Sequence, residues 1–196
     1  METKRRFSTV KITYLALFTA LVAVLQYLGG FIRIGAMFSV SLVLVPIVIG
    51  SAIVGKWSGA WLGFVFAIMV FITGDAAAFL TINPLGTIIT VIVKGVAAGI
   101  ASGMIYSVTE RINRYFAVIL SAIVCPIVNT GVFLVGCNLF FYDAVSEWAT
   151  LEGVSVGVYM ISILVGFNFV FELIFNLFLA PTAVKLIDIG TSKIRK

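Results

Sequence analysis

The chain has 196 residues, of which 62% are hydrophobic and 11% are charged, whereas soluble domains are about 45–50% apolar and about 25% charged. This composition excludes an ordinary soluble domain. It indicates an all-α integral membrane protein with one domain over residues 1–196 and about six transmembrane helices in one bundle. The net charge of +5 does not indicate a nucleic-acid binder, because the cations cluster between the apolar segments.

Sequence features of enzymes, metal sites and cofactor sites are missing from the chain. It has no histidine, and Cys125 and Cys137 lie too far apart along one predicted helix to form a disulfide. No metal-ligand spacing, nucleotide-binding loop or catalytic motif such as H-E-x-x-H or G-x-S-x-G is found. We therefore expect neither an enzyme nor a resident metal or cofactor.

The predicted spans alternate with short connections. In chain order they cover about 12–29, 39–54, 57–73, 84–106, 116–138 and 157–187. Residues 1–11 form a basic leader to a retained first helix, since no A-x-A-like cleavage site follows the apolar run. Pro46 should kink or thin the second span. The sixth span is longer than a bilayer requires, so we expect it to tilt or to project into the cytoplasm.

The positions of the cations predict the topology. With this arrangement of spans, eleven of the thirteen Lys and Arg residues lie on one side of the membrane. These are Lys4, Arg5, Arg6, Lys11, Lys56, Arg111, Arg114, Lys185, Lys193, Arg195 and Lys196. By the positive-inside rule that side is the cytoplasm, and both termini lie there. The connections at 74–82, which contains Asp75, and at 139–156 are then outside loops.

The fourth span contains a lysine at membrane depth. Asn83 should cap this helix and Pro84 should occupy its first position, which places Lys94 about 15 Å further along. A charge at that depth is costly unless it faces protein, a partner or water. Small residues follow at Gly95, Gly99 and Gly103, a ridge that lets another helix approach closely.

Polar side chains on two further spans should lie near the depth of Lys94. Asn168, Glu172 and Asn176 are four residues apart and share one face of the sixth helix. Asn129 on the fifth span lies about 14 Å from the outer end of its helix, and Asn168 about 16 Å from the start of the sixth. A few convergent polar groups in an apolar setting predict a small-molecule site. Interhelical hydrogen bonds and a structural Lys94–Glu172 ion pair remain alternatives.

The outer connections extend the predicted binding set. The loop at 30–38 is apolar except for Arg33, so it is either a lid over a ligand or a segment resting on the membrane. We expect Phe31, Arg33 and Tyr142 to contribute to the site. The aromatic residues at 140–142 and 148 can equally form an interfacial belt.

These segments resemble a family, the substrate-binding S components of energy-coupling factor (ECF) vitamin transporters. The resemblance comprises the six-span size, the alanine motif of Ala16 and Ala20, and the segments SLVLVPIVIGSAIVGKWSGAWLG, VKGVAAGIASGMIY and NFVFELIFNLFLAPTAVKL. It is closest to the branch that includes riboflavin and pantothenate binders. The order and spacing of these segments, rather than any one motif, make up the likeness.

The resemblance implies a binding subunit without ATPase activity in the plasma membrane of a prokaryote. It would dock on a transmembrane coupling protein joined to two cytoplasmic ATPases, through the first-helix face of Ala16, Ala20 and Ala23, and carry its ligand inward by toppling. The ligand site would lie near the outer side, under the loop at 30–38. Lys94 favours an anionic vitamin such as pantothenate, although a flatter flavin or pyridine stays open.

Two other classes are weighed against this reading. A small lipid-processing enzyme or assembly factor should gather several acidic or histidine groups at one interface, and the chain shows no such group. A self-sufficient secondary transporter should contain an internal repeat with broken helices, which the sequence does not show.

Overall fold

The computed structural model describes residues 9–30 and 42–194, with side chains up to residue 192. Every regular element in these ranges is a helix. In chain order the helices are α1 (Thr9–Gly29), α2 (Leu44–Val54), α3 (Lys56–Ile72), α4 (Ala77–Leu80), α5 (Pro84–Thr109), α6 (Arg114–Phe140), α7 (Tyr142–Leu151), α8 (Val156–Val158), the π-helix η1 (Tyr159–Leu164) and α9 (Gly166–Ile194). The all-helical fold class is therefore confirmed.

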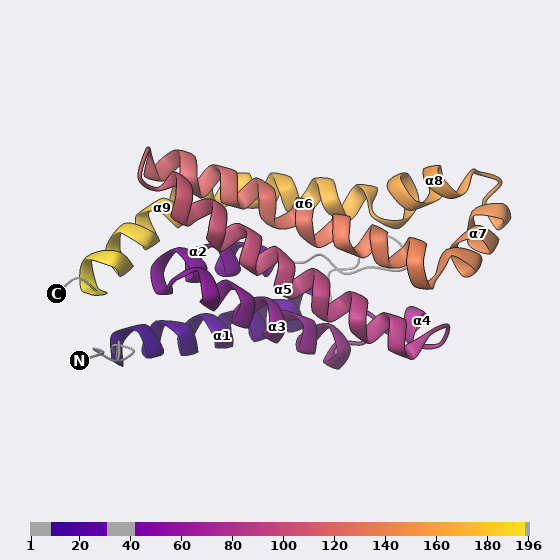
Figure 1. Ribbon diagram of the computed structural model, residues 1–196, viewed down its shortest axis with the longest axis horizontal. Coiled ribbons are helices and arrows are strands. Elements are labelled where there is room, and N and C mark those ends of the chain that lie inside the picture. Colours follow the sequence, from indigo (N-terminus) through magenta and orange to yellow (C-terminus); the bar gives the residue numbers. More distant parts are fainter. Residues whose placement is uncertain (1–8, 31–41, 195–196) are drawn as a thin grey trace, which may run out of the picture.

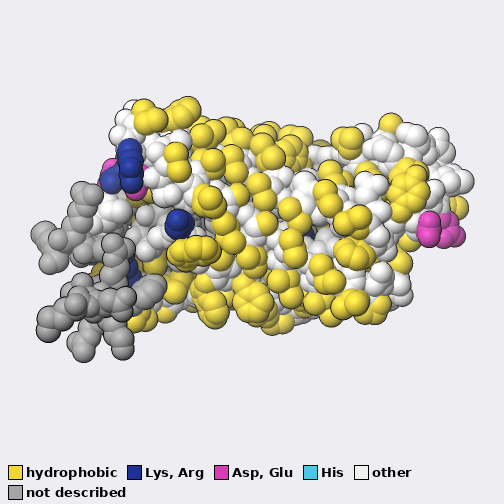
Figure 2. Space-filling model, in the orientation of Figure 1, with side chains coloured by type: hydrophobic (Ala, Val, Ile, Leu, Met, Phe, Trp, Pro, Cys, Tyr) yellow, Lys and Arg dark blue, Asp and Glu magenta, His cyan; other side chains and the backbone are white. Residues whose placement is uncertain are grey.

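The long helices run side by side along the long axis of the molecule (Figure 1). Within the described ranges, α1, α5, α6 and most of α9 are long and apolar enough to cross a membrane, whereas α2 and α3 are apolar but shorter. One end of the bundle holds the start of α1 and the end of α9; the opposite end, called the α7 end below, holds α4 and α7. Hydrophobic side chains cover the middle of the visible face (Figure 2), as the lipid-facing surface of a multi-pass membrane protein requires.

Helices α3 and α5 pack backbone against backbone. A Cβ atom added at Gly59 would overlap the carbonyl of Gly99, and one added at Gly63 would overlap the carbonyl of Gly95. Contacts this close are possible only between residues without side chains. The expected ridge on α5 is confirmed, and its partner is a second glycine pair on α3. This seam fixes the position of Lys94, which directly precedes Gly95.

The start of α5 is as expected: the side chain of Asn83 accepts a hydrogen bond from Gly86 N at 2.9 Å, and Pro84 opens the helix. Pro46, which was expected to kink or thin the second span, has a different role. It lies in the first turn of α2, where the missing N–H breaks no intrahelical bond. The proline therefore marks a helix start, and residues 39–41 of the predicted span lie outside the described residues.

The region after α6 differs from the sequence-based expectation. The predicted outside loop at 139–156 contains the amphipathic helix α7, which buries Val145 and Ala149 and exposes acidic residues such as Asp143 and Glu147. The predicted single sixth helix is divided into α8, η1 and α9, with a break at Val165. A Cβ at Gly166 would lie 2.6 Å from the carbonyl oxygen of Ile161, so the backbone at this junction needs a glycine.

The buried apolar side chains form two separate clusters. The larger, the bundle core, joins α1, α2, α3, α5, α6 and α9 and includes Phe66 and Val91. The smaller, the α7-end cluster, contains Phe79, Phe133, Phe141, Val145, Ala149 and residues of η1. A cavity lies where the two clusters meet, because its walls contain members of both.

Candidate functional site

The cavity between the two clusters is lined by five of the ten polar side chains that are buried among the described residues. Its volume is about 60 Å³. The lining residues are Gln26, Phe66, Val70, Asp75, Ala76, Phe79, Thr87, Thr90, Val91, Lys94, Asn129, Phe133, Phe141, Asn168 and Glu172. A smaller hollow of about 30 Å³ shares Lys94, Asn129 and Asn168 with it and reaches Val165 at the helix break.

Lys94 enters the cavity from α5 between two aromatic rings. Its Nζ lies 5.1 Å from the centroid of the Phe133 ring and 5.7 Å from that of Phe66, distances at which a ring face attracts a cation. The carboxylates of Glu172 and Asp75 line the same cavity as this lysine. Two carboxylates and two rings therefore compensate a charge that would otherwise be costly at this depth.

Helix α9 supplies a carboxylate and an amide to the same cavity. Glu172 is 1% exposed, and its Oε1 accepts a hydrogen bond from Nδ2 of Asn168 at 3.0 Å. The two residues are one helical turn apart, so the bond forms along the face of a single helix. Asn176 is buried one turn further on but does not line the cavity.

Another side of the cavity is formed by α1 and the turn after α3. Gly74, with a φ of +78°, reverses the chain at this turn, and Asp75 follows it. Asp75 Oδ2 accepts hydrogen bonds from Gln26 Nε2 at 2.7 Å and from Thr73 Oγ1 at 2.9 Å. Gln26 is 1% exposed although it lies on the most peripheral of the long helices. This hydrogen bond gives the buried Gln26 side chain a polar partner.

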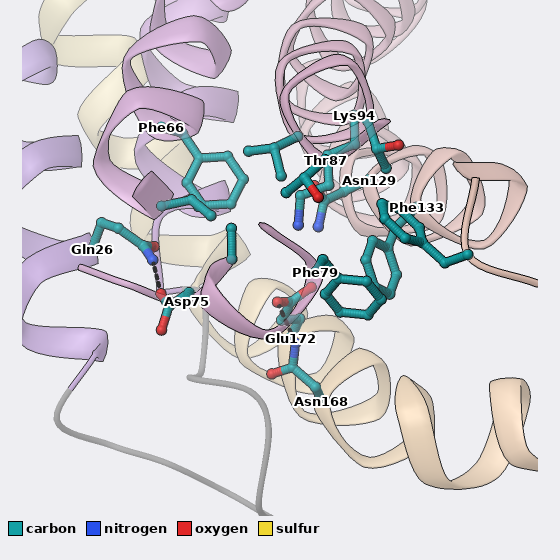
Figure 3. Close-up of a pocket in the computed structure, with 15 residues that line it drawn as sticks. Gln26, Phe66, Asp75, Phe79, Thr87, Lys94, Asn129, Phe133, Asn168 and Glu172 are labelled. Carbon is teal, nitrogen blue, oxygen red and sulfur yellow. Dashed lines mark hydrogen bonds between the residues drawn. The ribbon is translucent and has the colours of Figure 1, made fainter. Parts of the chain in front are cut away.

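Aromatic rings close the cavity on the side of the α7 end. Phe79 of α4 packs edge to face against Phe133, with 5.5 Å between ring centroids, and against Phe141 at 4.9 Å. The ring of Trp148 on α7 also packs against Phe79, with 5.8 Å between the centroids. Figure 3 shows Phe79 and Phe133 beside Glu172, with Lys94 and Asn129 across the cavity. The arrangement offers flat apolar faces next to charged groups, the composition of many small-molecule sites.

The structure brings together four of the residues singled out from the sequence: Lys94, Asn129, Asn168 and Glu172. Asn176 and Tyr142 do not belong to the lining, and the Tyr142 side chain is 49% exposed at the start of α7. Phe31 and Arg33 lie outside the described residues. On α1, Ala16 and Ala20 are exposed and Ala23 is half-buried.

Sequence reasoning missed Gln26, Asp75 and the aromatic wall. Gln26 had a usable signal, because a lone glutamine in an apolar span must face protein or water. Asp75 was assigned to an exposed outside loop, and only the folded turn shows that this carboxylate reaches the cavity. The aromatic rings had no distinguishing signal among the chain's many phenylalanines.

These features define a class, a multi-pass helical membrane protein with a polar cavity inside an apolar bundle. The family model "ECF transporter, substrate-specific component" matches residues 10–184, and the chain therefore belongs to this family of transporter components. A solved structure of ThiT from Listeria monocytogenes has a TM-score of 0.64 and 19% identity over 91% of this chain and 97% of that chain. At this identity the likeness shows a shared fold. Among curated protein sequences, none matches this chain significantly.

Proposed function

We propose that the protein is the substrate-binding subunit of an ECF-type vitamin transporter in the plasma membrane of a prokaryote. Six spans with both termini in the cytoplasm accord with the charge distribution along the chain. The cavity takes up a small water-soluble vitamin outside the cell. Delivery inward follows when the loaded subunit docks on a transmembrane coupling protein driven by two cytoplasmic ATPases.

One observation supports this proposal most directly: charged and amide side chains from five separate segments line a single cavity inside an otherwise apolar bundle. They come from α1, the turn after α3, α5, α6 and α9. Stability alone does not call for such a convergence, since apolar residues of similar volume serve at least as well as buried ion pairs. Binding of a polar small molecule explains it.

The charges in the cavity favour a cationic ligand over an anionic one. Among the described lining residues, Lys94 contributes one positive charge and Asp75 and Glu172 contribute two negative charges, so these residues sum to +1 − 2 = −1. The expectation of a pantothenate-like anion rested on Lys94 alone and did not include Asp75. We therefore propose a thiamine-like vitamin, a cation built from heteroaromatic rings. The likeness to ThiT, a thiamine ECF S component, supports this choice.

The size of the cavity implies that the walls move when the ligand binds. A volume of about 60 Å³ holds about two water molecules at roughly 30 Å³ each, whereas ligand pockets are usually about 300–1,000 Å³. The wall on the side of the α7 end is a separate cluster with its own small core. Displacement of that cluster from the bundle core enlarges the cavity without opening the α3–α5 seam.

The docking surface proposed for the coupling protein is the outer face of α1. Ala16 and Ala20 are exposed there, while the opposite face buries Phe18, Val22 and Gln26. A flat, small-residue surface lets another helix approach closely. A lipid-processing enzyme is less well supported, because no group of three or more acidic, histidine or cysteine side chains suited to a metal occurs among the described residues.

The test is to purify the protein in detergent, release bound small molecules by denaturation and identify them by mass spectrometry. Calorimetric titration of the emptied protein with thiamine and with pantothenate follows. We expect a released heteroaromatic cation and sub-micromolar thiamine binding, with pantothenate at least 100-fold weaker. Preferential binding of pantothenate would overturn the proposed substrate, and release of a lipid with no vitamin binding would overturn the proposed function.

A further inference from the structure

We infer that the cavity has a donor wall and an acceptor wall, and that Gln26 and Asn168 make the acceptor wall selective for ligands that present N–H groups. The donor wall is centred on Lys94 of α5; Asn129 of α6 lies beside it, and its buried Oδ1 has no hydrogen-bond partner among the described residues. The acceptor wall is Gln26, Asp75, Asn168 and Glu172. The inference rests on the proposed function and specifies which edge of the ligand faces which wall.

Two carboxylates determine how the amides of the acceptor wall are oriented. The nitrogen and oxygen of an amide have nearly the same shape, so its orientation follows from its hydrogen bonds. A carboxylate oxygen accepts hydrogen bonds, and in each of the two pairs it lies within hydrogen-bond distance of the amide nitrogen. The amide of Gln26 must therefore direct Nε2 to Asp75, and that of Asn168 must direct Nδ2 to Glu172.

This orientation leaves two carbonyl oxygens for another donor. Among the described residues, neither Gln26 Oε1 nor Asn168 Oδ1 has a hydrogen-bond partner, although both atoms are buried. Buried acceptors without partners are uncommon, because each loses its hydration without compensation. Rotating either amide would place its oxygen against a carboxylate oxygen, so an amide flip cannot satisfy these acceptors within the described part of the chain. A ligand with N–H groups can donate hydrogen bonds to both oxygens.

The opposite wall carries the donor, Lys94. The ammonium of Lys94 has three donors and no acceptor, and Figure 3 shows Lys94 and Asn129 together, across the cavity from Asn168 and Glu172. The flat faces of Phe79 and Phe133 lie between the two walls. A planar ligand therefore binds with its amino-bearing or cationic edge toward Gln26 and Asn168 and with an acceptor toward Lys94.

The inference predicts discrimination between an amino group and an oxo group at one ring position. An oxygen there would face carbonyl and carboxylate oxygens, and a site built for hydrogen bonds rejects a ligand that leaves its groups unpaired. The probes are thiamine and the thiamine analogue whose ring amino group is replaced by oxygen. Their affinities are measured by calorimetry on the wild-type protein and on the variants Gln26→Leu, Asn168→Leu and Asn176→Leu.

Asn176→Leu is the matched control, since Asn176 lies on the same helix, is buried and also has an unpartnered Oδ1, but does not line the cavity. We expect the wild type and Asn176→Leu to prefer thiamine at least about tenfold, and Gln26→Leu and Asn168→Leu to prefer it less than about threefold. A general loss of folding would lower the affinity for both probes alike and leave the ratio of the two affinities unchanged. Equal binding of the two probes by the wild type, or an unchanged preference in both cavity variants, would overturn the inference.

If the wild type binds neither probe, the proposed substrate fails and the inference is tested separately. Thermal-shift measurements then compare aminopyrimidines with the corresponding pyrimidinones, and the molecule released from the purified protein is identified. Stabilisation by the amino members supports the acceptor wall. Stabilisation by the oxo members, by neither series, or a released ligand with only acceptor groups overturns it.

Discussion

Gln26 and Asp75 join the first helix to the wall of the cavity through a hydrogen bond of 2.7 Å. Helix α1 also packs through a narrow apolar stripe, and Thr19 Oγ1 accepts a hydrogen bond from Trp61 Nε1 at 3.0 Å. The helix that exposes Ala16 and Ala20 thus also ends at the binding cavity. A ligand that contacts Asp75 is only one hydrogen bond away from the proposed docking helix.

Asp75→Asn should weaken thiamine binding at least about tenfold. The amide oxygen can still accept from Gln26 and Thr73, so the main change is the loss of a negative charge beside a cationic ligand, worth more than 1.4 kcal/mol in a partly desolvated site. Calorimetric titration measures the effect. Asp143→Asn, which removes an exposed acid on α7 at the same end of the bundle, is the control and should leave the affinity unchanged. Equal affinities of Asp75→Asn and wild type would exclude Asp75 from cation binding.

Gly99→Ala should destabilise the folded protein by about 1–3 kcal/mol, because the new methyl group overlaps the backbone of Gly59 and forces α3 and α5 apart. The midpoint of thermal unfolding in detergent measures this loss. Gly131→Ala is the matched control: this glycine lies inside α6, and a Cβ there meets no atom within 4 Å. That change should be neutral or stabilising by up to about 1 kcal/mol. A midpoint for Gly99→Ala no lower than for Gly131→Ala would contradict the packed seam.

Ala16→Trp and Ala20→Trp should leave vitamin binding intact while abolishing uptake and co-purification with the coupling protein. The indole would hold a partner helix away from α1 without touching the cavity. Leu17→Trp introduces the same side chain at an exposed position on another face of α1 and should retain uptake. Loss of vitamin binding in the alanine variants would mean that these residues support the bundle rather than a docked partner.

The α7-end cluster should open more readily than the bundle core. Cys137 belongs to that cluster and Cys125 to the core, and both thiols are free and 0% exposed. In single-cysteine variants a thiol-reactive probe should label Cys137 at least about tenfold faster than Cys125, since local opening costs less than global unfolding. A saturating vitamin should slow the labelling of Cys137. Equal labelling rates would argue that the cavity enlarges in some other way.

The elements that the sequence predicted well are those with a strong local signal. Apolar length predicted the long helices, and Asn83 with Pro84 predicted the start of α5 to the residue. The failures lie where local signals conflict. Pro46 was expected to kink a span but opens one. The segment after Phe140 has too little hydrophobicity for a span, yet it folds into α7 because two buried residues pack on the α7-end cluster.

Part of the cavity was predictable for a similar reason. Polar residues inside apolar helices must face protein or water. Counting the rise along each helix places Lys94, Asn129 and Asn168 near one depth, and Glu172 shares a helix face with Asn168. Depth does not say which faces meet, so Asn176 was grouped with them although it does not line the cavity. Asp75 lies in a short connection, where no periodicity indicates the direction of a side chain.

The sequence by itself determined the membrane class, the helical fold and the depth at which polar groups occur, since each of these follows from the spacing of apolar and charged residues along one chain. Only the tertiary structure decided which polar groups share a cavity. The glycine seam sets the position of Lys94, the turn at Gly74 brings Asp75 to Gln26, and Glu172 orients Asn168. The resulting balance of one cation against two carboxylates depends on contacts between residues far apart in the chain, which no local pattern encodes.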